Sequence, residues 1–303
     1  MNPDIDIVIP CAGRTDDLLR LLGSLHEHAA QGLVRHVASI TATDDRHSDD
    51  LGQRLRATFP QVRYVPGPAR GPAANRNHGA RQGRAAWLLF LDDDCHVRHD
   101  LIAAYAQGRA THATARVLEG AIHAVGMRPN GNHHAPLNSE GGKLWSCNVL
   151  VERALFEALG GFDEQFPYAC LEDNDLHRRL RAAGAGIAFV PGAAVLHPWR
   201  SISEREVTRQ IISHAIFAQK HPDFARAFDL LHLLRAMRGR LALYSSGQPT
   251  SIPMTKYRTV AYDFAAPLAV YAVVRIAPLR RHLWQRYRNA VPERAAAIEA
   301  VRG

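Results

Sequence analysis

The stretch Leu88-Leu89-Phe90-Leu91-Asp92-Asp93-Asp94 decides the fold. Four apolar residues in succession fit a strand that is covered on both faces, as in a parallel sheet. Three carboxylates follow directly, at the C-terminal end of that strand, where open α/β sheets bind ligands. In extended chain Asp92 and Asp94 point to the same side, and a hard divalent ion such as Mg²⁺ or Mn²⁺ would offset the adjacent charges. A solvated acidic loop or a helix cap is the alternative that this stretch leaves open.

Strands and helices alternate along the first hundred residues. We expect strands at 4–10, 34–41, 62–65 and 87–94, and helices at 18–28, 49–58 and from the Gly71-Pro72 loop to about 83. This alternation is typical of a parallel, doubly wound sheet. There is no GxGxxG after the first strand and no GxxxxGK[ST], so neither a dinucleotide-binding fold nor a P-loop is indicated.

The second hundred residues read as a mixture of strands, loops and helices. We expect strands near 116–125, 144–151, 187–190 and 193–196, and helices at 101–108, 153–159 and from the acidic stretch at 172–175 to Gly184. Residues 127–142 are rich in Pro, Asn, Gly and His and predict a long loop near a substrate opening. From Ser203 onward the pattern is helical.

Composition limits the class of protein. A chain of 303 residues with 47% hydrophobic and 22% charged residues can bury a large core and form two domains or one large one. Its four cysteines are scattered without a CxxC pair, which favours a reduced compartment over a disulfide framework. Residues 1–6 have no basic and apolar leader, so no secretory signal is expected.

The positive charge is concentrated in the C-terminal quarter. Residues 230–303 hold twelve Lys and Arg against three Asp and Glu, a charge of +9, so the rest of the chain carries −1 of the total of +8. A nearly neutral body argues against nucleic acid bound across the whole surface. The distribution instead fits a basic appendage that meets an anionic partner.

Two polar motifs stand beside the expected ligand crevice. Asp44-Asp45 end the second strand, where they would either cap the next helix or accept hydrogen bonds from a nucleoside. Arg76-Asn77 lie in the first turns of a helix, and Arg76 is either a surface residue or a bidentate phosphate ligand.

Two later motifs allow structural and chemical interpretations. Glu172-Asp173-Asn174-Asp175 precede a helix, where acids gain roughly 0.3–1 kcal/mol from the helix dipole, yet one of these carboxylates could act as a general base. His197 follows a strand, and it is a metal ligand only if distant carboxylates converge on it. No HExxH spacing occurs elsewhere.

Taken together, these motifs resemble the family-two inverting glycosyltransferases, which have the GT-A fold. The resemblance covers about residues 5–200 in the family's order, and its linked motifs are far more specific than any one of them. The matching motifs are Ile7-Val8-Ile9-Pro10 with Arg14, Thr43-Asp44-Asp45, Gly71-Pro72-Ala73-Ala74-Asn75-Arg76-Asn77-His78-Gly79, Phe90-Leu91-Asp92-Asp93-Asp94, Gly160-Gly161-Phe162-Asp163-Glu164, Leu171-Glu172-Asp173-Asn174-Asp175-Leu176 with Arg179, and His197. The resemblance implies an α/β nucleotide-diphospho-sugar transferase fold, with a Rossmann-like mixed sheet flanked by helices.

The resemblance also implies a role for each matched residue. The donor-binding residues would be Pro10, Arg14, Asp44, Asp45, Arg76, Asp92 and Asp93. Asp94 and His197 would hold Mn²⁺ or Mg²⁺. Asp173 would be the catalytic base, with Glu172 and Trp145 in the acceptor region.

These roles imply a single reaction. A divalent ion would stabilise the leaving nucleoside diphosphate, and Asp173 would take the proton of the acceptor hydroxyl. One base and no covalent nucleophile imply a single displacement with inversion. The implied partners are a nucleotide-sugar donor, with UDP-sugars the commonest in the family, and a glycan or lipid-linked acceptor, with no nucleic acid.

The sequence departs from the family pattern at two places. Arg46-His47 follow the acidic pair where Gly-Ser is usual, and Cys11 stands where a small or hydroxyl residue is commoner. A catalytically silent glycan- or lipid-binding protein on the same scaffold is the alternative function. Retention of Asp94, Asp173 and His197 favours the enzyme. A nucleotidyltransferase is the nearest enzymatic rival, but residues 10–15 lack its glycine-rich run.

The domain organisation follows from these patterns. Residues 1–200 would form the catalytic domain, donor-binding over about 1–95 and acceptor-binding and catalytic over about 96–200, with a helical basic region at 201–303.

The longest uncharged run in the basic region, Phe264–Val274, falls short of the about 20 residues that span a bilayer. Basic and aromatic residues surround this run: Lys256, Arg258, Tyr262, Tyr271, Arg275, Arg280, Arg281, Trp284, Arg286, Tyr287 and Arg288. Such a segment would lie on an anionic membrane or pack on the catalytic domain. We therefore expect a cytoplasmic protein, with the inner face of the plasma membrane as its site of attachment if the segment meets lipid.

Overall fold

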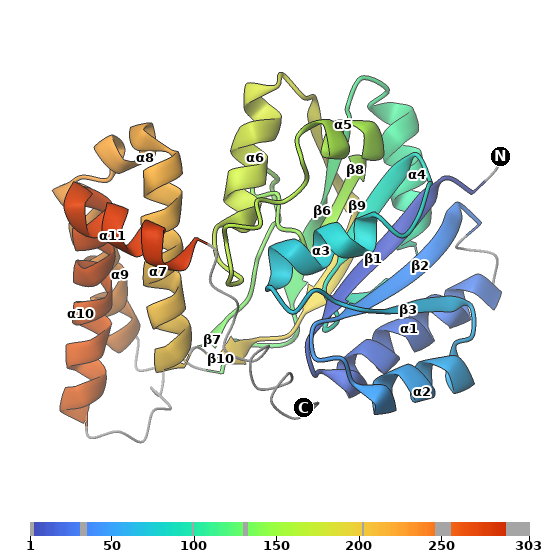
Figure 1. Ribbon diagram of the computed structural model, residues 1–303, viewed down its shortest axis with the longest axis horizontal. Coiled ribbons are helices and arrows are strands. Elements are labelled where there is room, and N and C mark those ends of the chain that lie inside the picture. The colour runs from blue at the N-terminus through green and yellow to red at the C-terminus, as the bar shows by residue number, and fades with distance from the viewer. Residues whose placement is uncertain are drawn as a thin grey trace.

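The computed structural model describes residues 3–30, 35–98, 100–129, 133–201, 203–245 and 256–288. An eight-stranded sheet with helices on its faces stands beside a group of C-terminal helices (Figure 1). The sheet contains β1 (Ile5–Cys11), β2 (Val37–Asp44), β3 (Val62–Pro66), β4 (Trp87–Leu91), β5 (His96–Val97), β6 (Val117–Ala124), β8 (Asn148–Glu152) and β9 (Ile187–His197). Two short strands, β7 (His133–His134) and β10 (Arg200–Ser201), form a separate antiparallel pair.

The helices fall into two groups. Those that accompany the sheet are α1 (Thr15–Ala30), α2 (Asp49–Thr58), α3 (Pro72–Ala80), α4 (Leu101–Thr111), α5 (Arg153–Ala158) and α6 (Glu172–Ala182). Those of the C-terminal group are α7 (Glu204–Lys220), α8 (Pro222–Ala227), α9 (Leu230–Ser245), α10 (Lys256–Arg275) and α11 (Ala277–Tyr287).

The strand order is β3-β2-β1-β4-β8-β6-β9-β5. The N-terminal half is parallel, since β1 pairs parallel with β2 and β4, and β2 pairs parallel with β3. The carboxyl ends of these strands therefore meet at one edge. The parallel arrangement predicted from the first hundred residues is confirmed for these strands, whereas β8, from the later part of the chain, runs antiparallel to both β4 and β6. The mixed sheet that the resemblance implied is confirmed.

The apolar run of β4 is covered on both faces, as predicted. All four residues Leu88–Leu91 are fully buried. Leu89 and Leu91 join the core under α1, whereas Leu88 and Phe90 face the opposite core. On that side the Phe90 ring lies 5.2 Å from the rings of both Phe156 and Phe162. The acidic triplet therefore continues from a strand that both cores hold in place.

Three details differ from the sequence expectations. Residues 187–190 and 193–196 form the single strand β9, because its pairing with β6 jumps from Val190 to Ala194 and accommodates the Pro191-Gly192 pair between them. Helix α1 begins at Thr15, three residues before the expected start at 18, so Asp16 and Asp17 lie in its first turn. Trp145 precedes β8 in a loop. Val34, the expected start of β2, and residues 130–132 of the long loop lie outside the described residues.

The C-terminal helices pack on one another through α7. This helix contacts α8, α10 and α11, and α10 in turn contacts α9. Val273 and Val274 of α10 are buried in the shared core. Within the described ranges we find no helix that combines the length and the apolar character needed to cross a membrane. The side chains of Lys256, Arg258 and Tyr262, which the sequence singled out, lie outside the described residues.

Candidate active site

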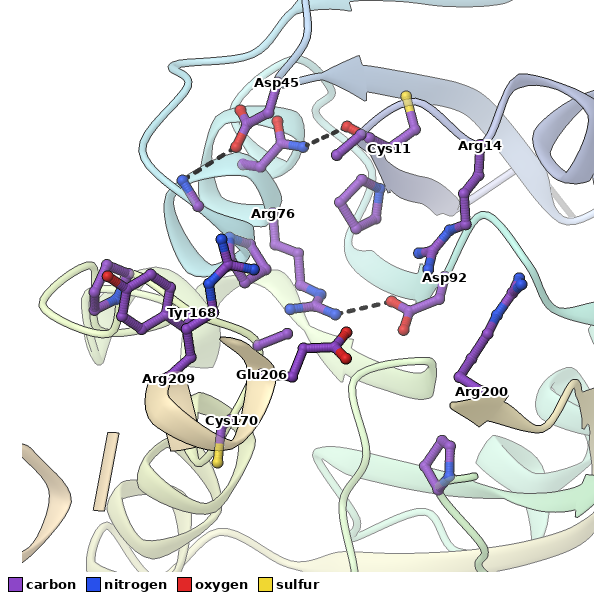
Figure 2. A pocket seen from close by; sticks show the side chains of 18 of the residues that line it. Cys11, Arg14, Asp45, Arg76, Asp92, Tyr168, Cys170, Arg200, Glu206 and Arg209 are labelled. Atoms are coloured by element: carbon purple, nitrogen blue, oxygen red, sulfur yellow. Dashed lines mark hydrogen bonds and ion pairs between the residues drawn. The ribbon is translucent and has the colours of Figure 1, made fainter. Parts of the chain in front are cut away.

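A pocket of about 410 Å³ opens at the carboxyl ends of β1, β2 and β4 (Figure 2). The loops after these strands and the start of α3 form one side. Residues Pro167–Cys170, β10 and the first turns of α7 form the other. Of the residues predicted from the sequence, the pocket is lined by Pro10, Arg14, Asp45, Arg76, Asp92 and His197. Asp44, Asp93, Asp94, Trp145, Glu172 and Asp173 lie outside its lining.

The three aspartates after β4 have different partners. Asp92 accepts a hydrogen bond of 2.8 Å from Nη2 of Arg76 (Figure 2). Asp93 accepts one of 2.7 Å from Nε of Arg14. Asp93 is fully buried, and burial raises the pKa of its carboxyl to about 7 against the opposing effect of Arg14. The Asp93 carboxylate is thus used by Arg14, whereas Asp92 and Asp94 bring their carboxylate oxygens close together.

Asp94 lies at the centre of a charged cluster. Nε of Arg200 is 2.9 Å from Oδ2 of Asp94, and Nε2 of His197 is 3.2 Å from Oδ1. Burial acts to raise the pKa of Asp94, but His197, Arg14 and Arg200 outweigh it and hold the pKa well below its usual range. Asp94 therefore stays ionised in the protein interior.

Asp92, Asp94 and His197 bring their ligand atoms within 4.8 Å of one another. Nδ1 of His197 lies 2.8 Å from the carbonyl oxygen of Pro198, which can only accept, so Nδ1 carries the proton and Nε2 faces Asp94. Oδ1 of Asp94 is buried, and apart from Nε2 of His197 no group in the described part of the chain contacts it as a hydrogen-bond or ion-pair partner. Two carboxylates and one imidazole form a donor set that suits Mn²⁺ or Mg²⁺. These residues fit a divalent ion.

Arg76 links the acidic triplet to α6. Its guanidinium is almost fully buried and lies 3.1 Å from Oε1 of Glu172 as well as 2.8 Å from Asp92. Burial acts to lower the pKa of Arg76, but Asp92, Asp173 and Glu172 raise it above its ordinary value. Arg76 therefore remains a cation that joins both carboxylate groups.

Glu172 and Asp173 occupy the first turn of α6 behind Arg76. Leu171 enters this helix with a left-handed φ of 69°, a strained backbone position for a residue with a side chain. Burial raises the pKa of Glu172 to about 8 and also raises that of Asp173. Oδ2 of Asp173 accepts from the amide of Ser146 at 3.1 Å, whereas its buried Oδ1 has no hydrogen-bond partner among the described residues. One oxygen of Asp173 is thus fixed by a hydrogen bond, and the other accepts none from the described residues.

The adjacent acids Asp44 and Asp45 face different surroundings. Asp44 is fully buried and accepts hydrogen bonds from the amides of Arg46 and Ser48, so its carboxylate is used in the turn before α2. The cap of that helix is Ser48. Asp45 lines the pocket and accepts from the amides of Ala69 and Gly71 at 3.0 and 3.1 Å. Burial raises the pKa of Asp45 to about 6.

Gly71 makes the close approach between the two sides of the pocket. Its φ is 97°, and a Cβ there would lie 2.3 Å from the carbonyl oxygen of Pro167. Only glycine fits this position without moving the backbone. The Gly71-Pro72 motif of the sequence therefore positions α3 and Arg76.

A buried glutamate that the sequence analysis missed orders the predicted acceptor region. Glu119 of β6 accepts from the amides of Gly142, Lys143 and Leu144 and from the side chain of Asn138, at 2.7–3.2 Å. This loop leads to Trp145, whose Nε1 donates to the carbonyl oxygen of Leu137 at 3.2 Å. A lone acidic residue in an otherwise apolar strand was the only sequence signal.

Three more pocket residues come from segments without a recognised motif. Arg200 follows His197 by three positions, and this proximity could have indicated it. Tyr168 and Arg209 lie on the side of the pocket opposite β1, with the Arg209 guanidinium 5.2 Å from the centre of the Tyr168 ring (Figure 2). Arg209 belongs to α7, so a helix of the predicted C-terminal region helps to build the pocket.

The sheet and the cluster at its carboxyl edge define the GT-A class of fold. Two solved structures share it: GalNAc-T7 with UDP, GalNAc and Mn²⁺ has a TM-score of 0.52 and 17% identity, covering 65% of this chain and 43% of that one. The mannosyltransferase PcManGT from Pyrobaculum calidifontis, in complex with GDP-Man and Mn²⁺, has a TM-score of 0.50 and 15% identity, covering 99% and 79%.

Sequence comparison points to one family. The model described as Glycosyl transferase family 2 matches residues 6–143, a little under half of the chain. An N-acetylglucosaminyl-diphospho-decaprenol L-rhamnosyltransferase of Mycobacterium tuberculosis is 36% identical over 33% of this chain and 32% of its own length. The Pre-mycofactocin glycosyltransferase of the same species is 28% identical over 73% and 48%. The chain thus spans less than half the length of either relative.

Proposed function

We propose that the chain is an inverting glycosyltransferase that moves a sugar from a nucleotide-diphosphate donor, with a UDP-sugar as the first candidate, to a hydroxyl of a glycan or lipid-linked acceptor. The observation that carries the proposal is the cluster of Asp92, Asp94 and His197, whose ligand atoms lie within 4.8 Å of one another at the pocket. Asp45 and Arg76 line the same pocket. An acidic nucleoside contact, a cation site and a buried arginine are what a nucleotide sugar requires.

The donor would lie along the loops after β1, β2 and β4. Asp45 stands at the nucleoside end, where its carboxylate is already oriented by two backbone amides. Pro10 forms part of the wall, and the guanidinium groups of Arg14 and Arg76 line the interior. Both arginines are held by carboxylates of the triplet, so they are fixed before a diphosphate arrives and lose little freedom on binding.

Asp92, Asp94 and His197 would hold Mn²⁺ or Mg²⁺. A bound divalent ion would stabilise the negative charge that develops on the leaving diphosphate. Arg200 and Arg14 already balance the charge of Asp94 from the protein side.

Asp173 is the proposed general base. Its Oδ2 is anchored on Ser146, and its Oδ1 is buried without a partner among the described residues, which leaves it able to accept the proton of the acceptor hydroxyl. Burial raises the pKa of Asp173, and a more basic carboxylate accepts a proton more readily. No nucleophile is assigned on the opposite face of the sugar, so one displacement with inversion is the proposed course.

The acceptor would approach from the side of the loop that Glu119 orders, near Trp145 and Glu172. One relative is named for transfer to an N-acetylglucosaminyl-diphospho-decaprenol. That name supports a lipid-linked glycan as the acceptor class to test first.

A thermal-shift screen of nucleotide sugars with and without Mn²⁺ tests this function. We expect one donor class to raise the melting temperature only when Mn²⁺ is present, with EDTA as the control for trace metal. A donor that stabilises the chain equally without metal would contradict the cation site. A chain that responds to no donor would favour a catalytically silent glycan- or lipid-binding protein.

A further inference from the structure

The C-terminal helices expose apolar side chains that no described element covers. Leu230, Leu231 and Leu234 of α9 are 56, 50 and 52% exposed. Leu268 of α10 is 47% exposed, Ile276 between α10 and α11 is 51% exposed, and Leu279 of α11 is 37% exposed. Large apolar side chains gathered at this density on a surface mark an interaction site.

These residues come from two stretches that pack together. The Phe228 ring, just before α9, lies 6.5 Å from the ring of Tyr271 in α10. Nη1 of Arg275 donates to the carbonyl oxygens of Ala225 and Arg226 at 3.2 and 3.0 Å. These contacts join α8 and the residues before α9 to the C-terminal part of α10, and α9 itself contacts α10, so the exposed residues lie on neighbouring elements.

Helix α9 is only lightly packed. Its main neighbour is α10, and Leu233 is its one buried side chain among those described. In Figure 1 α9 and α10 stand at the far end of the molecule from the sheet. The shared core of these helices is formed by other residues, including Ala215, Ala225, Val273 and Val274, so the exposed leucines are not needed to hold the group together.

The same region carries more positive than negative charge, although the exposed Asp229 directly precedes α9 and pairs with His232. Arg235 and Arg238 of α9 and Arg281 and Arg286 of α11 are exposed. Neither residues 230–238 nor residues 265–288 contain a single Asp or Glu. An apolar surface bordered mainly by cations matches the interface of a bilayer that contains anionic lipid, where apolar side chains enter the acyl boundary and arginines remain at the phosphates.

We propose that the face defined by Leu230, Leu231, Leu234, Leu268, Ile276 and Leu279, here called the leucine face, binds the surface of an anionic membrane. The leucines enter the interface, and the arginines of α9 and α11 contact lipid phosphates. This inference is independent of the proposed catalytic function, because it concerns none of the pocket residues.

Co-sedimentation of the full chain with vesicles tests the leucine face. We expect the protein to pellet with vesicles of equimolar phosphatidylglycerol and phosphatidylcholine at low salt, to pellet less at high salt, and to stay in solution with phosphatidylcholine alone. The variant Leu230→Ser/Leu231→Ser/Leu234→Ser should lose at least about tenfold in vesicle partitioning, since each leucine loses its apolar contact. Arg235→Gln/Arg238→Gln should also weaken binding.

Two matched control variants test whether vesicle binding depends on the leucine face or on exposed apolar and charged side chains in general. Met127→Ser/Leu137→Ser removes exposed apolar groups elsewhere, and Arg54→Gln/Arg98→Gln removes exposed charge elsewhere. Both should bind vesicles like the wild type. All four variants should melt like the wild type, because surface substitutions change stability little.

Three results would overturn the proposal. The wild type could fail to pellet with anionic vesicles, or the triple leucine variant could pellet as well as the wild type. The wild type could instead form a dimer by light scattering that the leucine variant dissolves, without binding vesicles, which would assign the face to self-association. The donor-induced thermal shift should be the same in every variant, so failure here leaves the glycosyltransferase proposal untouched.

Discussion

Nε of Arg200 lies 2.9 Å from Oδ2 of Asp94, although 106 residues separate the two in the chain. The contact joins β10 to the acidic end of β4. Arg200 also reaches Oδ2 of Asp17 at 2.8 Å, so its guanidinium is held between α1 and the triplet. Because 42% of its side chain stays exposed in the pocket, Arg200 is placed to contact the anionic part of a donor.

Arg200→Gln should lower kcat/KM for the donor by roughly 10- to 100-fold, the equivalent of one charge-assisted hydrogen bond. The measurement is initial-rate kinetics with the nucleotide sugar that the thermal-shift screen selects. Arg98→Gln removes a comparable exposed charge outside the pocket and should leave the rate unchanged. Equal rates for Arg200→Gln and the wild type would rule out a role for Arg200 in donor binding.

Asp94→Asn should weaken Mn²⁺ binding by more than about tenfold, because it removes one anionic ligand of the proposed site. Isothermal titration of the full chain with MnCl₂ measures this directly. Asp93→Asn is the matched control from the same triplet. Since Asp93 faces Arg14 in the interior, this variant should keep Mn²⁺ affinity within about threefold of the wild type. If Asp93→Asn weakened Mn²⁺ binding more than Asp94→Asn does, the metal ligand would be Asp93 and not Asp94.

Asp173→Asn should reduce transfer by at least about a hundredfold, since an amide cannot take the acceptor proton. Binding of the donor should persist, because Asp173 lies outside the pocket lining. Single-turnover transfer and the donor-induced thermal shift report the two properties separately. Asp223→Asn, an exposed acid paired with Arg178, is the control. Normal transfer by Asp173→Asn would show that Asp173 is not the general base.

Asp45→Asn should change how stability depends on pH. Burial raises the pKa of Asp45 to about 6, so the folded chain keeps this proton to a higher pH than the unfolded chain. The wild-type free energy of unfolding therefore falls as the pH rises from about 4 to about 6, by up to about 3 kcal/mol from this group. The variant lacks this contribution. Urea unfolding at pH 4.5 and pH 7 should show the wild type losing stability relative to Asp45→Asn, and parallel profiles would contradict the burial of this carboxylate.

Glu119→Gln should destabilise the fold by about 2–4 kcal/mol, since an amide cannot accept the three backbone hydrogen bonds that the carboxylate accepts. Urea unfolding at neutral pH measures the loss. Glu140→Gln, an exposed acid near the loop that Glu119 orders, should unfold like the wild type. Equal stability of the two variants would show that the loop does not depend on Glu119.

The fold was largely predictable from local pattern. The run Leu88–Leu91 predicted a strand with both faces covered, and both cores confirm it. The range of α2 was predicted to the residue. The direction of β8 was not predictable, because an apolar strand has the same pattern whether its neighbour runs parallel or antiparallel.

The site was predictable only in part. The motifs named the carboxylates, Arg76 and His197, and the structure brings Asp92, Asp94 and His197 together. The sequence could not show which of two adjacent residues in a motif would line the pocket. Asp44 bonds the turn before α2 while Asp45 faces the pocket, and this division depends on how the turn packs.

By itself, the sequence determined the order of the elements, the buried strand before the acidic triplet and the candidate residues of the site, because periodicity and side-chain type can be read from consecutive residues. Tertiary structure alone decided that Arg200 reaches Asp94, that Arg209 on α7 enters the pocket and that Glu119 orders the loop before Trp145. These contacts join residues far apart in the chain, and only the packing of strands and helices brings them within hydrogen-bond distance.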